Sequence, residues 1–266
     1  ISTGVVTTFV GTAGTPGFTD GTGSAARFRS PIDIVYDGSG NLYVTDTGNY
    51  SLRKIDISTA AVTTLAAGQF DFAAFITYDG SGNLYVTDIF GHTVRKIVIS
   101  TGAVTTLAGT RGASGSTDGT GAAARFNTPT GITYDGSGNL YVADAQNFTI
   151  RKIVISTAAV TTFAGTAGAF GSTDGTGSAA RFNFPSDIVY DGSGNLYVLD
   201  TSNYTIRKIF ISTADVTTLA GTAGASGSTD ATGSAARFNT MYGITYDGSG
   251  KLYVADSQNC TIRTIT

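Results

Sequence analysis

The chain has 266 residues, of which 41% are hydrophobic, so it is long and apolar enough to bury a core. Only 13% are charged, the net charge is −3, and the 16 Lys and Arg residues are spread evenly, which excludes a basic nucleic-acid footprint or a polybasic membrane patch. No apolar run reaches the roughly 18 residues of a membrane span, and a single cysteine excludes an internal disulfide.

The remaining composition points to the outside of the cell. All 19 acidic residues are Asp, and Gly, Ser and Thr fill positions where charged residues are common. From this composition we expect an extracellular or cell-surface protein. No signal peptide is visible. The chain begins with Ile1 and not with Met, from which we expect a processed or trimmed product.

The first predicted element is the segment ISTGVVTTF at residues 1–9, which is rich in Val and Thr and matches later strand sequences. The stretch YDGSGNLYVTD follows at residues 36–46 and returns four times in close variants. The spacing is 42 residues from Tyr36 to Tyr78 and 56 residues in each later unit, a period typical of propellers and solenoids.

Each unit contains four short runs with β-strand composition. In the third unit they are GITYD (131–135), LYVAD (140–144), TIRKIVI (149–155) and AVTTFAG (159–165). The DGSGN between the first two is a tight hairpin turn, since Asp and Gly tolerate left-handed conformations. Four antiparallel strands in sequence predict one propeller blade.

The chain ends are in phase with each other. TIRTIT (261–266) stops inside a third strand, and VVTTFV (5–10) resumes where a fourth strand begins. We therefore predict a single all-β domain over residues 1–266, a closed five-bladed β-propeller of four-stranded antiparallel blades. In this prediction the N-terminal strand pairs with the three C-terminal strands and hides the edges of the ring.

The run LYVADAQNFTIR (140–151) and the connection GTAGAFGSTDGTGSAARFNFPSDI (165–188) resemble the NHL-repeat family. The resemblance covers essentially the whole chain and recurs five times. It implies a β-propeller, which in this family usually has six blades, whereas we count five. By architecture the chain also resembles propeller enzymes such as gluconolactonases, strictosidine synthases and amidating lyases. Those enzymes depend on a Glu or on several histidines, and this chain has no Glu and one His.

Repeated polar residues are interpreted as structural. One Asp per blade follows the LYV strand, and an Asn three residues later fixes the same turn in four blades; both suit Asx turns better than a metal ring. The Asn residues also begin N-x-S/T sequons. DGSGN lacks the Glu that a calcium loop requires. The columns are Asp46, Asp88, Asp144, Asp200 and Asp256, and Asn49, Asn147, Asn203 and Asn259.

His92 and Cys260 occupy a repeat position that holds Tyr50, Phe148 or Tyr204 elsewhere, so neither is expected to be catalytic. The long connections contain TDGTGSAARF, whose Asp and Arg residues we expect to pair or cap within a self-packed loop. A Gly-rich anion cradle is the alternative for these connections.

A ligand or partner site is expected where the repeat loses its symmetry. The second unit lacks 14 residues of the connection and reads AAGQFDFAAF (66–75) instead, a notch lined by Phe70, Phe72 and Phe75. The repeat position three residues before each Tyr also varies between blades. It holds an acid in two blades, an aromatic residue in one and glycine in the other two. The candidate binding residues are Asp33, Phe75, Asp187, Phe70 and Phe72.

We therefore predict a non-catalytic scaffold for protein or ligand binding or assembly, with no cofactor, no metal and no nucleic-acid partner. The partner is an unidentified protein or glycan, and open strand edges would drive homo-oligomer or filament assembly. A lectin-like multivalent sugar-binding propeller is the alternative, although Trp is absent. A propeller-type hydrolase or lyase is the second alternative.

Overall fold

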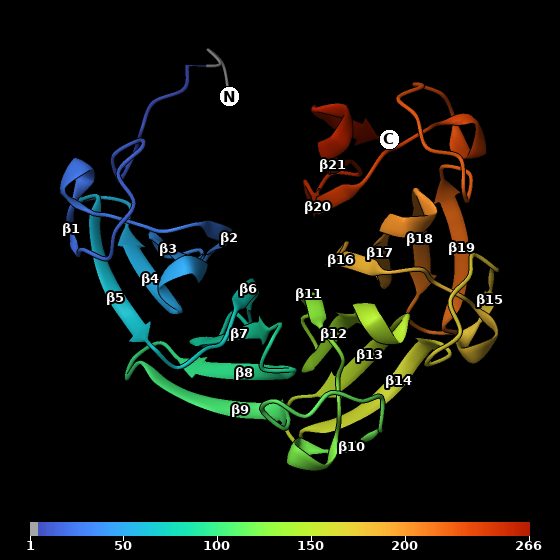
Figure 1. Cartoon of the computed structure of the whole chain (residues 1–266), viewed down its shortest axis with the longest axis horizontal. Coiled ribbons are helices and arrows are strands. Elements are labelled where there is room, and N and C mark those ends of the chain that lie inside the picture. The colour runs from blue at the N-terminus through green and yellow to red at the C-terminus, as the bar shows by residue number, and fades with distance from the viewer. Residues whose placement is uncertain (1–4) are drawn as a thin grey trace. The chain divides into compact units, whose positions relative to one another are not determined.

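The computed structural model describes residues 5–266 and shows an all-β, five-bladed β-propeller of small antiparallel sheets (Figure 1). The described helices are three-residue 3₁₀ turns. None is long and apolar enough to cross a membrane. These turns span Gly23–Ala25, Thr47–Asn49, Gly121–Ala123, Ala145–Asn147, Gly177–Ala179, Thr201–Asn203, Gly233–Ala235 and Ser257–Asn259.

The third sheet illustrates the repeat. Its main strands are β11 (Pro129–Tyr134), β12 (Asn139–Asp144), β13 (Thr149–Val154) and β14 (Ala159–Gly165), in the spatial order in which they follow in sequence. All neighbouring pairs are antiparallel, which confirms the predicted meander. A two-residue strand β10 (Gly119–Thr120) from the preceding connection pairs with the outer edge of β14 and gives the sheet a fifth strand.

The first and fourth sheets have the same five-strand order. The first contains β1 (Gly21–Thr22), β2 (Pro31–Tyr36), β3 (Asn41–Asp46), β4 (Ser51–Asp56) and β5 (Ala61–Ala67). The fourth contains β15 (Gly175–Thr176), β16 (Pro185–Tyr190), β17 (Asn195–Asp200), β18 (Thr205–Phe210) and β19 (Asp215–Ala220).

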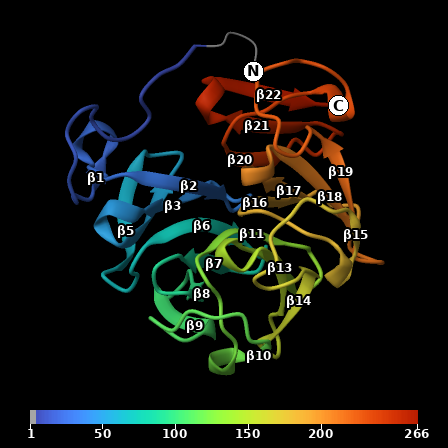
Figure 2. The same ribbon diagram turned by 45° about the vertical axis from the view of Figure 1, so that its right-hand side comes forward.

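The second sheet has four strands, β6 (Ala73–Tyr78), β7 (Asn83–Asp88), β8 (Thr93–Val98) and β9 (Ala103–Gly109). The fifth sheet has three, β20 (Met241–Tyr246), β21 (Leu252–Asp256) and β22 (Thr261–Ile265), drawn in red in Figure 2. The chain divides into two compact units, residues 1–86 with 96–105, and residues 87–95 with 106–266.

The DGSGN turns form as predicted. In the third sheet the Asp135 carboxylate accepts hydrogen bonds from the backbone N–H groups of Ser137 (2.8 Å) and Asn139 (3.0 Å). Gly136 has φ +74°, a conformation that glycine adopts without steric cost. The recurring stretch is therefore a hairpin fixed by its own Asp.

Among the residues that the structure describes, the N-terminal segment does not pair with the last sheet, and the predicted closure of the propeller by this segment stays a prediction. Within residues 5–266, the last sheet consists of β20, β21 and β22, and β22 pairs with β21 alone. Residues 5–9 adopt no strand conformation, and Val5 and Val6 are exposed. A β-strand is stable only with a hydrogen-bonded neighbour, so the matching sequence by itself does not make this segment a strand.

The hydrophobic core lies between consecutive sheets. Ile188 on β16 belongs to one buried cluster with Tyr141, Ala143 and Ile150 of the third sheet. Ile76 on β6 is buried in the same way with Tyr43 and Leu52 of the first sheet. The inner strands β6 and β16 are therefore each covered by the face of the sheet that precedes them in sequence.

Candidate functional site

A buried arginine on the third strand of the blade organises its polar interior. Arg151 is fully buried, and its Nη1 lies 2.8 Å from Oδ2 of Asp144 on β12. Its Nη2 lies 2.6 Å from Oδ1 of Asp118 in the connection that precedes the blade. The guanidinium stands 5.2 Å from the ring centre of Phe126, within cation–π range. Arg53, Arg207 and Arg263 repeat the arrangement.

The Asp and Asn columns are structural, as interpreted from the sequence. Besides Arg151, Asp144 accepts hydrogen bonds from the backbone N–H of Asn127 (2.7 Å) and from Nδ2 of Asn147 (2.7 Å). These bonds tie the end of β12 to the following turn and to the connection. The Asp144 carboxylate therefore makes its hydrogen bonds and ion pair within the blade and its connection.

The connection Asp closes the outer strand onto the blade. Asp118 accepts two hydrogen bonds from Thr162 on β14, one from its backbone N–H and one from its hydroxyl, each 3.0 Å long. Asp20 and Thr64, and Asp174 and Thr218, make the same pair of bonds. Burial raises the pKa of Asp174, but the Thr218 bonds and Arg207 outweigh it and leave the pKa lowered.

This Asp was expected to pair with the arginine of its own connection. Instead Asp118 pairs with Arg151 on the strand. Nη1 of Arg125 donates to the backbone carbonyls of Ala122 (2.5 Å) and Ala124 (2.7 Å). The connection is a self-packed loop, as predicted, but its charged residues have different partners.

The fifth sheet has the same pair of a connection Asp and a strand Arg, which we call the connection latch, but no outer strand. Asp230 lies 2.6 Å from Arg263, yet its side chain is 92% exposed, against 49% for Asp174. Ala231 and Thr232 correspond to the short strands β1, β10 and β15, and they form no strand. Among residues 5–266, no strand pairs with the outer edge of β22.

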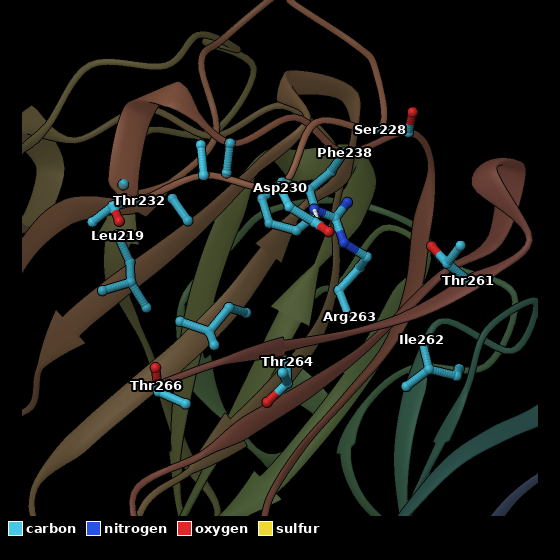
Figure 3. A pocket seen from close by; sticks show the side chains of 15 residues that line it. Leu219, Ser228, Asp230, Thr232, Phe238, Thr261, Ile262, Arg263, Thr264 and Thr266 are labelled. Carbon is cyan, nitrogen blue, oxygen red and sulfur yellow. Dashed lines mark hydrogen bonds and ion pairs between the residues drawn. The ribbon is translucent and has the colours of Figure 1, made fainter.

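A groove of about 590 Å³ occupies this position (Figure 3). The Asp230 and Arg263 side chains meet in its wall, and Thr264 on β22 and Thr266 just after it also line the groove (Figure 3). Its lining also includes Leu219, Ala220, Ser228, Thr232, Gly233, Ala236, Phe238, Thr261, Ile262 and Ile265. We name this surface, the outer edge of β22 with these residues, the β22 groove.

The β22 groove combines an unpaired backbone edge with apolar surface. Ile262 is 72% exposed, whereas Leu52, Ile150 and Ile206 at the same repeat position are fully buried. An open edge with few charges is a template for another strand. Reasoning from the sequence missed this site because it assigned the position to residues 5–10.

The predicted binding residue Asp33 and the predicted notch residues of the second unit have structural contacts. Asp33 on β2 accepts hydrogen bonds from the backbone N–H groups of Ile76 on β6 (2.9 Å) and Ile34 (2.8 Å). Burial raises the pKa of Asp33, and these two bonds oppose the shift. Phe70 is buried in the core, and Phe72 and Phe75 are half-buried. Asp33 thus joins two inner strands.

Asp187 has the same role between the fourth and fifth sheets. It accepts hydrogen bonds from the backbone N–H groups of Ile244 on β20 (2.9 Å) and of Ile188 (2.8 Å). Gly131 on β11 leaves room for it, because a Cβ there would lie 2.5 Å from an Asp187 oxygen. The acids that interrupt the repeat's symmetry are bridges between neighbouring inner strands. A ligand role for these residues stays a prediction.

His92 and Cys260 occupy a conformational position, consistent with their shared place in the repeat. Both have positive φ (53° and 55°), as do Tyr50, Phe148 and Tyr204. Nδ1 of His92 accepts a hydrogen bond from the backbone N–H of Thr128 (3.1 Å), and Cys260 is exposed. Each residue closes the turn that leads into the third strand of its blade.

Comparison with known proteins agrees with this blade. The NHL repeat family matches residues 28–55, 126–153 and 182–209, each of which runs from the Phe that precedes the blade through the Arg-bearing strand. The chain belongs to the NHL-repeat family of β-propellers.

Two relatives are similar along nearly the whole chain. Protein SUPPRESSOR OF QUENCHING 1, chloroplastic, from Arabidopsis thaliana is 28% identical over 96% of this NHL-repeat chain, and the match covers 27% of that protein. NHL repeat-containing protein 2 from Homo sapiens is 26% identical over 93% of the chain, and the match covers 40% of that protein. The chain thus spans well under half the length of these relatives.

Solved structures share the fold at low identity. A chain of a nidogen/laminin complex has a TM-score of 0.68 at 15% identity and covers 91% of this chain and 77% of its own. A streptogramin B lyase has a TM-score of 0.63 at 13% identity, with 90% and 69% covered. Propellers of this shape therefore occur both in a protein complex and in an enzyme.

Proposed function

We propose that this NHL-repeat propeller is a non-catalytic scaffold that binds other proteins by taking an extended segment into the β22 groove. The observation that carries the proposal is the latch of Asp230 and Arg263 without an outer strand. In three other blades the same latch holds a strand of sequence V-T-T-[L/F]-A. Strand addition to an open edge is a common mode of peptide recognition.

The chemistry of the groove defines the segment it prefers. The edge of β22 supplies backbone hydrogen bonds, which are indifferent to side chains. Asp230 adds a specific contact, since its counterparts accept both the N–H and the hydroxyl of one Thr. A small or β-branched, uncharged segment with Thr at that register is therefore the expected ligand. The low-charge composition supports an extracellular or cell-surface setting for this role.

A labelled, end-blocked peptide AVTTFAG, the sequence of β14, tests the proposal by fluorescence anisotropy. It is titrated with the full-length chain and with the full-length double variant Thr7→Pro, Thr8→Pro, in which the N-terminal copy of the segment cannot pair. We expect saturable binding to at least the double variant, and an affinity at least about tenfold lower after Asp230→Arg is added. About 1.4 kcal/mol of lost binding free energy corresponds to that factor.

Two controls distinguish binding in the groove from nonspecific binding. Ser226→Arg adds the same positive charge on an exposed part of the same connection, outside the groove lining, and is expected to leave the affinity unchanged. The peptide AVPPFAG lacks the two central N–H donors and is expected not to bind. Absence of saturable binding to both forms of the chain would overturn the proposal.

A further inference from the structure

Four blades carry an N-glycosylation sequon at the turn before the third strand. The second blade has Gly91 in place of the Asn. Such sequons belong on exposed surface, where a sugar can be attached to the Asn amide. In each, the hydroxyl residue is the first residue of the third strand, and the sequons read NYS (49–51), NFT (147–149), NYT (203–205) and NCT (259–261).

The Asn147 amide uses both of its N–H groups within the blade and its connection. Nδ2 donates to the carbonyl oxygen of Gly115 (2.7 Å) and to Oδ2 of Asp144 (2.7 Å). An Asn amide has two N–H donors, so neither is left for another partner. The other three sequons repeat both bonds at 2.7 or 2.8 Å, to a connection glycine and to the Asp of the same turn, from Asn49, Asn203 and Asn259.

Attachment of a sugar is incompatible with this pair of bonds. The transfer forms a bond from Nδ2 to the anomeric carbon of the sugar, breaks the bond from that carbon to a lipid pyrophosphate, and removes one proton from Nδ2. The carbon then lies where one N–H pointed, toward an acceptor only 2.7 Å from Nδ2, and no carbon fits between them. Moving the Asn147 amide aside would deprive the buried Asp144 carboxylate of a donor, which costs folding free energy.

Burial also keeps the sequons of the third and fourth sheets away from an enzyme. Asn147 and Asn203 are 7% and 6% exposed, and the hydroxyl residues Thr149 and Thr205 are 1% and 2% exposed. A transferase must reach the Asn amide and recognise the hydroxyl residue two positions later. These two sequons are therefore accessible only while their blades are unfolded.

We propose that folding of a blade and N-glycosylation of its sequon exclude each other. The folded chain is no substrate for an oligosaccharide transferase, and a chain that receives a glycan at Asn147 or Asn203 before folding cannot complete the blade. This exclusion does not depend on the β22 groove. It adds a condition to the proposed extracellular setting, because the chain must then be exported by a route on which no transferase modifies its unfolded sequons.

The purified, folded chain tests whether the folded state is a substrate. It is incubated with solubilised oligosaccharide transferase and a lipid-linked oligosaccharide, and its intact mass is measured. The wild-type chain is expected to gain no mass. Ser226→Asn completes an N-G-S sequon with Gly227 and Ser228, at an exposed position of a connection, and is expected to gain one glycan.

Peptides that contain the sequons, cut from the denatured wild-type chain, are expected to be modified under the same conditions. Unmodified peptides would mean that the sequence, and not the fold, blocks the transfer. A glycan that mass spectrometry assigns to Asn147 or Asn203 of the folded chain would overturn the proposal.

Translation of the full chain, behind a cleavable signal peptide, into microsomes that contain the transferase tests the converse. Limited proteolysis measures folding, because a protease cuts the open form of a chain. Molecules with a glycan at Asn147 or Asn203 are expected to be cut, and unmodified molecules are expected to resist. Protease-resistant molecules with a glycan at either Asn would contradict the exclusion.

Thr149→Ala with Thr205→Ala is the matched variant for the microsome experiment. It removes two sequons but keeps Asn147 and Asn203 with their hydrogen bonds. Neither Thr hydroxyl makes a hydrogen bond among the described residues, so the variant is expected to fold. Where the wild-type chain is modified at these positions, the protease-resistant fraction of the variant is expected to be larger, and an equal fraction would count against the proposal.

Discussion

Nη1 of Arg151 and Oδ2 of Asp144 lie 2.8 Å apart with both side chains fully buried, and the same pair joins the second and third strands of the first and fourth sheets. A buried ion pair adds little folding free energy compared with apolar packing, but removing one partner leaves the other charge buried and unpaired. The main effect of the pair is therefore to fix which strand faces the connection, and its net contribution to stability is small.

Arg151→Met is accordingly expected to lower the free energy of unfolding by about 3–5 kcal/mol, because Asp144 is left buried without its cation. Adding Asp144→Asn to that variant removes the stranded charge, so the double variant should be less destabilised than the sum of the two single variants. Urea denaturation of all four chains gives the coupling energy. Additive effects would contradict the role assigned to the pair.

Gly131 is required by its neighbour and not by its own backbone. A Cβ at this position would lie 2.5 Å from both Cα and Oδ1 of Asp187, so one of the two inner strands must move. Gly131→Ala is expected to cost about 1–3 kcal/mol of folding free energy, the usual range for overpacking. Thermal and urea unfolding measure the change.

Gly243→Ala is the matched control for this substitution. Gly243 occupies the same repeat position, and its added Cβ would meet the Ala255 Cβ at an ordinary 3.9 Å. We expect a change within about 0.5 kcal/mol, as for substitutions that create no clash. Equal losses at the two glycines would show that the contact with Asp187 is not the cause.

The connection latch makes a pH-dependent contribution to stability. The pKa of Asp174 is lowered from its ordinary value of 3.8, since the Thr218 bonds and Arg207 outweigh the opposing effect of burial. A carboxyl with a lowered folded pKa stabilises the fold above the unfolded pKa and loses that contribution as the pH falls through the folded value. The loss therefore begins below about pH 4.

Asp174→Asn is expected to cost about 1 kcal/mol at pH 7, a modest value because the side chain is half-exposed to solvent. The difference from wild type should shrink when the pH is lowered to about 2, because the wild-type carboxyl is increasingly protonated as the pH falls below its ordinary pKa. Urea unfolding at the two pH values measures it. Asp230→Asn, at the open latch, is expected to cost less at pH 7, and a difference for Asp174→Asn that ignores pH would contradict the assignment.

The blade could be predicted from the sequence because its determinants are local. The DGSGN turn carries its own Asp ligand and glycines, and the strands on either side have β-branched and aromatic residues, so the hairpin at Asp135 formed where expected. The partner of Asp118 could not be predicted, since Arg125 is close in sequence while Arg151 is brought near only by the folded sheet.

Closure of the ring cannot be established from the sequence, for a different physical reason. VVTTFV has the same propensity as AVTTFA, but a strand is defined by the edge it pairs with. AVTTFA follows its partner β13 through a short turn, so pairing is local, whereas residues 5–10 and β22 lie at opposite ends of the chain. The sequence prediction assigned the position beside β22 to residues 5–10, and the described residues place no strand there.

The residue before the third strand of each blade has a left-handed backbone conformation. Cys260 has φ 55°, which costs a non-glycine residue about 1 kcal/mol, and its exposed side chain contributes little packing. Cys260→Gly is therefore expected to raise the free energy of unfolding by a few tenths of a kcal/mol, after glycine's greater freedom in the unfolded chain is subtracted. Cys260→Val is expected to lower it by about 1–2 kcal/mol, because a β-branched residue fits this conformation worst.

Phe148→Gly, at the same repeat position, should be destabilising, since it removes the edge-on contact with Phe170 at 5.7 Å. Differential scanning calorimetry of the three variants reports the order, and stabilisation by glycine at both positions would mean that the aromatic contact contributes nothing.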